Sequence, residues 1–547
     1  MNFLFCLLLA AVTYGSPVHY PIELAGNFAE PRPNHFHGGC DVKTGQVTGK
    51  AIHSIGDGYV SHVSIGVGGY GNAVYVQHPE GYTSVYGHLK AFSLRVQAVL
   101  RKHQYAEQRT TGVFDFRPDE VPVAEGDFIA WSGNTGASEG PHLHLEVHST
   151  KDGNMHDPLA FIGRYVTDHV PPLGHGFMAC PMPGKGSFDG GSGDQVFGLT
   201  SHHLSNRFTA WGKVGFAIWA NDNMEATYNN YGVRLTQLFV DGKLVFQSDA
   251  NNIPINGNLQ VNYWGDYQHY IRSNVWYMRS FLLPGITLPV FKVGKDRGVI
   301  DFNQQRPYHI EYVLSDFAGN ASHYDFIVEG RKMAIAPYRK PAGPELFWNR
   351  FNIYPLAGAR LILKHHLLAD DVVIHPRVIR QPGKYSDAYH FMPGSYPLLG
   401  FGRIAIHLNK SVADPSKLYI ASHFGKERYM GGVYKNGWVT GPCRDLGAIY
   451  DIDCDDKAPS VIPVGQGGWT ARRQLTFSLG DTQSGLKGFK GFVDGHFVAF
   501  DQILQTPLVR CDLAEAPVRK TGREHQLKFI AWDQKNNQRV FVTQFKY

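Results

Sequence analysis

Short runs of alternating apolar and polar residues fill the chain between residues 47 and 147. Each run is bounded by glycine, proline, asparagine or aspartate, as expected for β-strands joined by tight turns. The runs are residues 51–66, 72–79, 82–89, 127–133 and 141–147. They predict a small antiparallel β-sheet domain. Residues 93–105 (SLRVQAVLRKHQY) interrupt the series, and their apolar positions fall at helical spacing behind Ser93, so a short inserted helix is predicted there.

The pattern changes beyond residue 165, at Val170-Pro171-Pro172, and the glycine-rich residues 184–193 suggest a linker or long turn. A weak internal repeat follows. VDGKLVFQ (residues 240–247) precedes SDFAGNAS (315–322), and VDGHFVAF (493–500) precedes AWDQKNNQ (531–538). In each pair a strand, an Asp-Gly turn and a strand come before another strand that ends in a polar turn, as in antiparallel sandwiches. We expect two immunoglobulin-like modules that flank a third β-rich module.

The predicted fold class is therefore mainly β: a small antiparallel β-sheet domain followed by immunoglobulin-like or β-sandwich modules. A chain of 547 residues exceeds the size of one hydrophobic core, which agrees with several domains. The predicted divisions are a leader at 1–15, the first sheet domain at 16–168, and modules at 169–335, 336–456 and 457–547.

The net charge is +5, from 52 basic and 47 acidic residues, and no long block of like charges suggests a nucleic-acid-binding arm. Such a mild excess would suit an anionic polymer. Residues Phe3 to Val12 form an apolar run of signal-peptide length, too short to span a bilayer, with small residues following near Gly15. We expect export to the periplasm, the cell envelope or the medium, with no membrane segment after removal of the leader. A buried first strand is the alternative.

Five cysteines remain after the predicted leader, an odd number in a compartment that permits disulfides. Cys443 and Cys454 bracket a short apolar stretch and are the expected partners. Cys40 lies within a histidine-containing motif and is expected to be a small buried core residue.

Three motifs in the first domain carry side chains that bind metals. NHFHGGCD places His37 and Asp41 four residues apart, and its two glycines would let the backbone turn so that imidazole and carboxylate converge. YTSVYGHL delivers His88 at a strand end, and GPHLHLEV places His142 and His144 on one face of a strand, roughly 6.5–7 Å apart. That spacing lets one histidine bind a metal while the other addresses a water molecule.

Two histidines and one carboxylate are a typical ligand set for catalytic zinc, because they leave one position for water or substrate. Zinc lowers the pKa of its water toward about 7 and polarises a carbonyl, and a nearby imidazole can accept the water proton. His88 and His142 fit that second role. Each motif alone is a modest signal in a chain with 27 histidines, but their occurrence in this order within one predicted domain makes chance unlikely.

These motifs resemble those of the lysostaphin/LytM-type peptidoglycan endopeptidases over about Gly26 to Val147, and RPNHFHGGCD resembles a subgroup found in exported Bacteroidetes proteins. The resemblance implies one Zn²⁺ per chain held by His37, Asp41 and His144. It also implies that His88 and His142 act on the water or the tetrahedral intermediate. The segment at residues 93–119 is longer than in the shortest family members, and we expect it to form one wall of the substrate groove.

The leading hypothesis is an exported zinc endopeptidase that cleaves peptide cross-links of peptidoglycan. An inactive scaffold that activates a wall amidase is an alternative, but such members lose ligands, and all five positions are filled here. A wall-binding or glycan-binding adhesive protein and a cupin-like metalloenzyme are further alternatives. His35 could replace a ligand, although a place outside the ligand set is favoured, and Glu146 could either orient a ligand or form a core ion pair. The sequence leaves the oligomeric state open.

Overall fold

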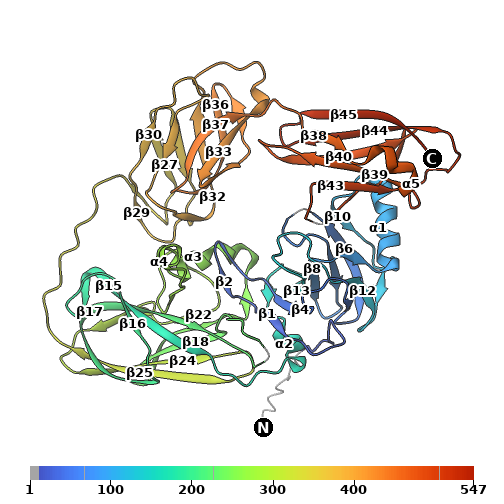
Figure 1. The fold of residues 1–547 in the computed structure, drawn as a ribbon. Coiled ribbons are helices and arrows are strands. Elements are labelled where there is room, and N and C mark those ends of the chain that lie inside the picture. The colour runs from blue at the N-terminus through green and yellow to red at the C-terminus, as the bar shows by residue number, and fades with distance from the viewer. Residues whose placement is uncertain (1–11, 67, 226, 504) are drawn as a thin grey trace, which may run out of the picture.

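The computed structural model describes residues 12–66, 68–225, 227–503 and 505–547, and its chain forms four β-rich units arranged in a ring (Figure 1). We call them the N-terminal domain and the second, third and fourth modules. The architecture is mainly β, as the sequence predicts.

The main sheet of the N-terminal domain holds the strands that carry the candidate metal-binding residues. Its strand order is β1-β4-β13-β8-β7-β6-β10. These strands are β1 (Leu24–Gly26), β4 (Cys40–Lys43), β13 (His142–Ser149), β8 (Tyr82–Gly87), β7 (Ala73–Gln77), β6 (Gly58–Ile65) and β10 (Gly112–Asp115). A smaller sheet has the order β5 (Ala51–His53), β12 (Phe128–Trp131) and β9 (Ala91–Phe92). The remaining elements are β2 (Pro31–Arg32), β3 (His35–Phe36), α1 (Leu94–Glu107), β11 (Pro122–Val123), β14 (Met155–His156), α2 (Leu159–Ile162) and the 3-10 turn Gly163–Tyr165.

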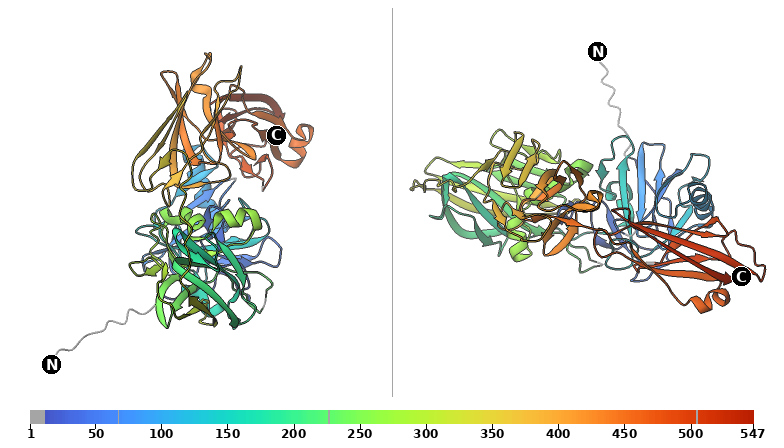
Figure 2. Two further views of the ribbon diagram at one scale, coloured as in Figure 1. Left: turned by 90° about the vertical axis from the view of Figure 1, so that its left-hand side faces the viewer. Right: turned by 90° about the horizontal axis from the view of Figure 1, so that it is seen from above.

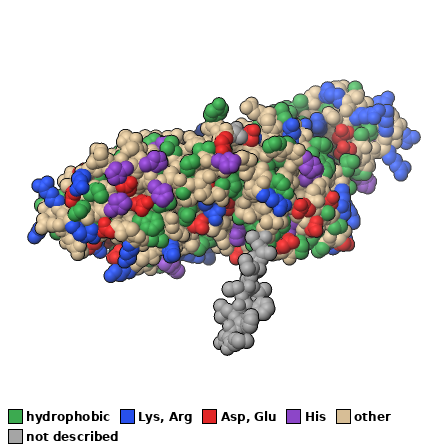
Figure 3. Space-filling view, turned by 90° about the horizontal axis from the view of Figure 1, so that it is seen from below, with side chains coloured by type: hydrophobic (Ala, Val, Ile, Leu, Met, Phe, Trp, Pro, Cys, Tyr) green, Lys and Arg blue, Asp and Glu red, His purple; other side chains and the backbone are tan. Residues whose placement is uncertain are grey.

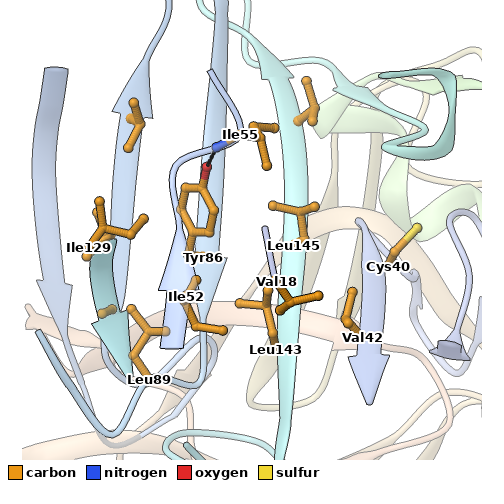
Figure 4. Packing of buried hydrophobic residues seen from close by; sticks show 14 of the residues in the cluster. Val18, Cys40, Val42, Ile52, Ile55, Tyr86, Leu89, Ile129, Leu143 and Leu145 are labelled. Atoms are coloured by element: carbon orange, nitrogen blue, oxygen red, sulfur yellow. Dashed lines mark hydrogen bonds between the residues drawn. The ribbon is translucent and has the colours of Figure 1, made fainter. Parts of the chain in front are cut away.

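Alternation along β13 divides the main sheet into a polar face and a core face. Leu143 and Leu145 are fully buried among Val42, Ile52 and Tyr86, so His142 and His144 point to the other face (Figure 4). The hydroxyl of Tyr86 accepts the backbone N–H of Ile55, which satisfies a polar group inside this core (Figure 4). The core therefore fixes the strand whose opposite face bears the two histidines.

The predicted inserted helix is confirmed as α1. Ser93 caps it by accepting the backbone N–H of Val96, and the buried side is formed by Val96, Leu100 and Gln104. Leu94 is 90% exposed, so the apolar stripe is narrower than the sequence suggested.

The second module contains a long sheet of order β16-β15-β17-β25-β24-β18-β19-β22. Its strands are β15 (Leu173–Phe188), β16 (Gln195–Gly198), β17 (His203–Asn221), β18 (Leu235–Val240), β19 (Lys243–Asp249), β21 (Met278–Arg279), β22 (Phe291–Val293), β23 (Ile300–Phe302), β24 (Pro307–Ser315) and β25 (Ala321–Gly330). The short strand β20 (Asn252–Ile253) instead pairs with β14 of the N-terminal domain. A helical segment that the sequence pattern did not predict follows β20: the 3-10 turn Ile255–Gln260, α3 (Val261–Trp264) and α4 (Tyr267–Ser273).

The third and fourth modules each consist chiefly of two antiparallel sheets. In the third, one sheet holds β27 (Asn352–Leu356), β28 (Ala359–Leu363), β32 (Pro397–His407), β36 (Trp438–Asp445) and β35 (Val433–Lys435). The other holds β30 (Arg377–Ile379), β31 (Ala388–His390), β37 (Ile449–Cys454), β33 (Leu418–Phe424) and β34 (Lys426–Tyr429), with the pair β26 (Glu345–Leu346) and β29 (Val372–Val373) beside them and the 3-10 turn Pro415–Lys417 before β33.

In the fourth module, one sheet holds β38 (Ser460–Pro463), β39 (Gln474–Gly480), β43 (Leu508–Asp512) and β42 (Asp501–Gln502). The other holds β41 (His496–Val498), β40 (Leu486–Val493), β44 (Glu524–Asp533) and β45 (Gln538–Lys546). The 3-10 turn Gln466–Gly468 and α5 (Trp469–Arg472) lie between β38 and β39.

The expected disulfide between Cys443 and Cys454 is wrong, since the five cysteines of the described residues are all free thiols. The two residues lie on consecutive strands that belong to different sheets. Cys443 is fully buried and contacts Tyr450, whereas Cys454 contacts Tyr385. Cys40 is fully buried, as expected, and burial raises its pKa well above the usual value, so it is an unreactive core thiol.

Most of the expected leader lies outside the described residues, but its last residues contact the N-terminal domain. Tyr14 is buried and stacks on Phe161, and the backbone N–H of Gly15 donates to the carbonyl of Ile55. No helix of the described chain has the length and apolar character that a membrane crossing requires.

Seen from above, the molecule is elongated, with the second module at one end and the fourth module at the other (Figure 2). The fourth module closes the ring by packing on α1 through the ion pair of Asp501 with Arg101. The face seen from below carries acidic and basic side chains interspersed, in keeping with the small net charge (Figure 3).

Candidate metal centre

The register of two antiparallel strand pairs assembles the centre. β13 pairs with β4 so that His144 faces Asp41, and it pairs with β8 so that His144 faces Gly87, the residue before His88. Residues directly opposite each other on antiparallel strands project from the same face. Segments more than a hundred residues apart in the sequence therefore bring a carboxylate and imidazoles together.

The two glycines of the HGG motif serve close packing here. The chain bends at Gly39, as the sequence predicts, without a positive φ at Gly38 or Gly39. A Cβ on Gly39 would lie 2.1 Å from the carbonyl oxygen of Leu145, and one on Gly38 would lie 2.4 Å from Oε1 of Glu146. Only glycine lets the chain approach β13 this closely.

Three of the predicted ligands converge at one point. Nε2 of His37 lies 3.1 Å from Nδ1 of His144 and 3.1 Å from Oδ1 of Asp41. Nδ1 of His144 lies 2.7 Å from the same oxygen. All three residues are buried.

The hydrogen bonds on the far sides of the rings show which nitrogens are free to bind a metal. Nδ1 of His37 donates to the carbonyl of Asn27 at 2.6 Å, and Nε2 of His144 donates to Oε1 of Glu146 at 2.8 Å. In a neutral ring the other nitrogen carries a lone pair, and in both residues this nitrogen faces the carboxylate of Asp41. Burial alone would lower the pKa of His144, but its hydrogen bonds to Asp41 and Glu146 raise it to about 10, so this ring carries a second proton that a bound cation would displace.

This donor set fits zinc. Three such atoms repel one another unless protons or a metal cation lie between them, and tetrahedral zinc with bonds of about 2.0–2.1 Å separates its ligand atoms by about 3.3 Å. The separations of 2.7–3.1 Å in the structure are close to that value. Burial alone would raise the pKa of Asp41, but the surrounding imidazoles hold it well below its usual value, so the carboxylate is ionised.

The other two predicted residues lie at the edge of this cluster. Nδ1 of His142 donates to the carbonyl of Gly140 at 2.8 Å, and its Nε2 lies 3.2 Å from Oδ1 of Asp41. Nδ1 of His88 donates to the carbonyl of Thr135 at 2.7 Å. His88, His142 and His144 also offer nitrogens within 4.8 Å of one another, which makes them a second candidate metal-binding group.

Burial, followed by the neighbouring His144 and His142, lowers the pKa of His88 to about 4. At neutral pH His88 is therefore an uncharged imidazole that can accept a proton. His88 itself has a φ of +59°, a conformation uncommon for a residue with a side chain, which turns the chain sharply after β8.

Two residues at the centre were not predicted from the sequence. Nη2 of Arg32 lies 3.1 Å from Oδ2 of Asp41, which leaves Oδ1 for the metal. The hydroxyl of Tyr70 donates to Oε2 of Glu146 at 2.8 Å. Arg32 is the first residue of the RPNHFHGGCD segment, although no role was predicted for it, and Tyr70 lies outside all three motifs. Glu146 orients the ring of His144, one of the two roles considered for it from the sequence. His35 is exposed, and among the described residues its side chain hydrogen-bonds only to the carbonyl of Pro33.

The centre opens into a groove of about 1390 Å³. Loops of the N-terminal domain line it, at residues 20–25, 30–38, 44–46 and 137–141, together with Asn258 of the second module. The inserted segment at residues 93–119 contributes nothing to this lining, so the expectation that it forms a wall is wrong. The buried side of α1 packs on its own domain, and Arg101 and Tyr105 face the fourth module.

Sequence comparison agrees with the geometry. Residues 35–113 match peptidase family M23, and residues 345–455 of the third module match the Zu5-like domain. The N-terminal domain therefore contains an M23 peptidase domain. The matched region ends before β13, so the positions of His142 and His144 come from the structure and not from this match.

Related proteins match only part of this chain. An uncharacterised metalloprotease of Haemophilus influenzae is 30% identical over 150 residues, which are 26% of this chain and 26% of that protein. The DD-carboxypeptidase/endopeptidase Mpg of Neisseria meningitidis is 34% identical over 111 residues, or 20% of each chain. The chain thus spans about a quarter or less of the length of these relatives. The catalytic domain of lysostaphin from Staphylococcus simulans is 20% identical, with a TM-score of 0.19, over 25% of this chain and 90% of that one.

Proposed function

We propose that this chain is an exported zinc metalloendopeptidase that hydrolyses peptide cross-links of bacterial peptidoglycan. The observation that supports it best is the convergence of three potential ligand atoms, Nε2 of His37, Oδ1 of Asp41 and Nδ1 of His144, within 3.1 Å of one another. These residues would hold one zinc ion. When bound, zinc supplies Lewis-acid chemistry, activating water and polarising the scissile carbonyl.

The roles of the other residues follow from their hydrogen bonds. The carbonyls of Thr135 and Gly140 fix the rings of His88 and His142, respectively, in the form that has Nδ1 protonated. Each Nε2 can then accept a proton from the attacking water or, once protonated, donate to the oxyanion of the tetrahedral intermediate. Both rings line the groove, so both are in a position to act on the water or on the tetrahedral intermediate.

The substrate class rests on the groove and on the relatives. A groove of about 1390 Å³ has room for a peptide. The name of the Neisseria relative, DD-carboxypeptidase/endopeptidase, favours peptides that contain D-amino acids, as the stem peptides of peptidoglycan do. Because both the ligand set and the two further histidines are present, hydrolysis is a better proposal than an inactive scaffold for a wall amidase.

Metal analysis and product analysis together test the proposal. The purified full chain should contain one zinc per molecule and should cut defined cross-linked muropeptides, with products identified by mass spectrometry. His144→Ala should lose both zinc and activity, while His142→Ala should keep zinc and lose activity by about 10²–10⁴-fold.

A matched control is His496→Ala, since His496 is exposed in the fourth module and should leave both properties unchanged. Cleavage of a protein substrate with intact muropeptides would overturn the wall assignment and leave the peptidase assignment. A full chain that binds no zinc would overturn both.

A further inference from the structure

Three buried carboxylates meet at the junction between the N-terminal domain and the second module. Asp168 lies in the linker, Asp222 follows β17 and Asp316 follows β24. Each offers an oxygen within 4.8 Å of the others. Their exposed fractions are 6%, 1% and 5%, so water does not solvate the cluster. It is separate from the candidate zinc centre, which uses none of these residues.

Two oxygens of this cluster have no hydrogen-bond partner. Oδ2 of Asp168 and Oδ1 of Asp222 are buried and unpaired among the described residues. Within the same part of the chain, no lysine, arginine or histidine forms an ion pair with any of the three carboxylates; the nearby His169 pairs with Glu225 instead. Burying several carboxylates without a counter-charge costs several kcal/mol per ion. A bound cation or a proton would remove this cost.

The junction between the third and fourth modules provides an internal comparison. There Asp455, Asp481 and Asp533 form a group with the same spacing limit of 4.8 Å. Nδ2 of Asn537 donates to the carbonyl of Asp455 and to Oδ2 of Asp533. The first junction repeats this arrangement, with Nδ2 of Asn320 donating to the carbonyl of Asp168 and to Oδ2 of Asp316.

The two junctions differ in how the linker carboxylate is satisfied. Oδ2 of Asp455 accepts the backbone N–H and the hydroxyl of Ser484, three residues after Asp481. Three residues after Asp222 the chain has Glu225, whose exposed carboxylate cannot donate. Both oxygens of Asp533 are also hydrogen-bonded. The carboxylates at the junction between the third and fourth modules are thus satisfied without an ion. The junction between the N-terminal domain and the second module has the same arrangement, but Oδ2 of Asp168 and Oδ1 of Asp222 have no partner among the described residues.

We propose that Asp168, Asp222 and Asp316 bind one hard divalent cation of the calcium class. The ligand atoms are all oxygens, as calcium prefers, whereas zinc in proteins usually takes nitrogen or sulfur ligands as well. Ca²⁺ is favoured over Mg²⁺ because Mg²⁺ usually keeps several waters and is held by only one or two carboxylates. Burial, followed by mutual repulsion, raises the pKa of Asp222 to about 8, and burial raises that of Asp168 to about 6; a divalent cation would relieve this cost.

The site lies at the base of a segment that supports the zinc centre. The backbone of Asp222 exchanges two hydrogen bonds with that of Tyr231, and the Tyr231 hydroxyl donates to the carbonyl of Leu24 in β1. Asn27 exchanges two hydrogen bonds with Gly232, and its carbonyl accepts Nδ1–H of His37. A cation at Asp222 would therefore hold the segment that orients His37.

Calcium binding to the full chain tests the proposal. The zinc-loaded protein is dialysed against metal-free buffer and titrated with Ca²⁺, Mg²⁺ or Tb³⁺, with heat and terbium luminescence as readouts. We expect one Ca²⁺ per chain, bound more tightly than Mg²⁺. Asp222→Asn and Asp316→Asn should weaken binding by about tenfold or more, because the site loses a ligand charge.

Two controls locate the site. Asp296→Asn removes an exposed carboxylate of the second module, and Asp481→Asn changes the equivalent residue of the other junction; both should bind Ca²⁺ like the wild type. Hydrogen exchange on the wild type, which needs no variant to fold, should show that Ca²⁺ protects residues 166–172 and 316–322.

Three results would overturn the proposal. The first is calcium binding that survives Asp222→Asn but not Asp481→Asn. The second is exchange protection elsewhere in the chain. The third is no Ca²⁺ bound together with higher thermal stability of Asp222→Asn than of wild type, which would identify a proton as the occupant. Zinc content is measured in every sample, so failure of this proposal remains distinguishable from failure of the zinc assignment.

Discussion

At the scale of single residues, Glu146 holds the candidate ligand His144 in place. Its Oε1 accepts Nε2–H of His144, while Oε2 accepts the hydroxyl of Tyr70 and Nε2–H of His148. Burial would raise the pKa of Glu146, but its bonds to His144 and His148 lower it, so the carboxylate is ionised. An ionised partner makes the imidazole a better metal ligand.

We predict that Glu146→Gln lowers zinc affinity by about 10–100-fold, because the ring of His144 loses a charged acceptor and the new amide cannot accept from all three donors. Competition with a chromogenic chelator measures the change. Tyr70→Phe is the matched control, since it removes one hydrogen bond and keeps the charge; its effect should be much smaller. Equal zinc affinity in Glu146→Gln and wild type would contradict the assignment of His144 as a ligand oriented by Glu146.

Asp157 gives a pH-dependent prediction. It is 4% exposed, and burial raises its pKa to about 6 despite Arg234 at 3.3 Å. Because the folded-state pKa exceeds the unfolded value of about 3.9, the native state is stabilised below about pH 4 and loses that contribution as pH rises to about 6. The loss amounts to about 3 kcal/mol.

Asp157→Asn should lack this loss, so the free energy of unfolding of the variant relative to wild type should rise by up to about 3 kcal/mol between pH 4 and pH 7. Denaturant unfolding of both proteins across this range measures the difference, and other titrating groups cancel. A difference that is constant with pH would show that Asp157 has an ordinary pKa in the folded protein.

Much of the centre could be predicted at this scale, and some of it could not. Alternation along residues 142–147 is enough to place His142 and His144 on one face, because strand geometry is local. Arg32 and Tyr70 escaped notice because their roles depend on contacts across the fold, with Asp41 and Glu146, and no periodicity records such contacts. The close packing of Gly38 and Gly39 on β13 was also missed, since these neighbours lie more than a hundred residues away in the sequence.

At the scale of elements, the second module holds the strand that leads to His37. Phe36 is buried against Trp264, and its backbone N–H donates to Oδ1 of Asn258 at 2.6 Å. The backbone N–H of Asn34 donates to Oδ1 of Asn262 at 3.0 Å. The helical segment at residues 255–264 thus acts as a clamp on β3.

We predict that Asn258→Ala destabilises the full chain by about 1–3 kcal/mol, because the N–H of Phe36 loses its acceptor in a buried setting, and that it also weakens zinc binding. Thermal unfolding and chelator competition measure the two effects. Asn303→Ala, an exposed position in the same module, should change neither. If zinc affinity is unaffected while stability falls, the clamp supports the fold without positioning His37.

The helices and strands were easier to predict than the tertiary contacts that they make. Strands of the N-terminal domain and α1 follow from local periodicity and capping, and the structure confirms them. The location of α1 away from the groove depends on which module packs against it, and the helical segment after β20 carries no regular apolar stripe that would have revealed it. Both features depend on tertiary packing, and the periodicity of a sequence does not indicate which segments pack together.

At the scale of the whole molecule, the fourth module closes the ring against the N-terminal domain. Nη1 of Arg101 lies 2.8 Å from Oδ1 of Asp501, and Tyr105 packs edge-on against Phe497. Nε2 of Gln505 donates to the carbonyl of Ser138, which lies in the 137–141 loop beside His142. The fourth module therefore contacts a wall of the groove directly, and its position should govern access for large substrates more than for small ones.

We predict that Arg101→Glu opens the ring, because it removes an ion pair and places a further carboxylate beside Asp501 and Glu515. An exposed pair contributes up to about 1 kcal/mol, and the new repulsion adds a similar amount, so the closed-to-open ratio should fall by about tenfold. Small-angle scattering should show a larger radius of gyration. Hydrolysis of intact cell-wall sacculi should rise while that of soluble muropeptides stays unchanged, since only the polymer is obstructed.

Charge reversal on both sides separates this effect from damage to the helix. Arg101→Glu combined with Asp501→Arg should restore both the scattering profile and the wild-type ratio of sacculus to muropeptide hydrolysis. Arg95→Glu makes the same charge change at an exposed position in the first turn of α1, six residues before Arg101, and should alter neither property. If Arg101→Glu opens the ring but leaves the ratio at the wild-type value, the fourth module does not limit access to the groove, and its role lies in stabilising the assembly alone.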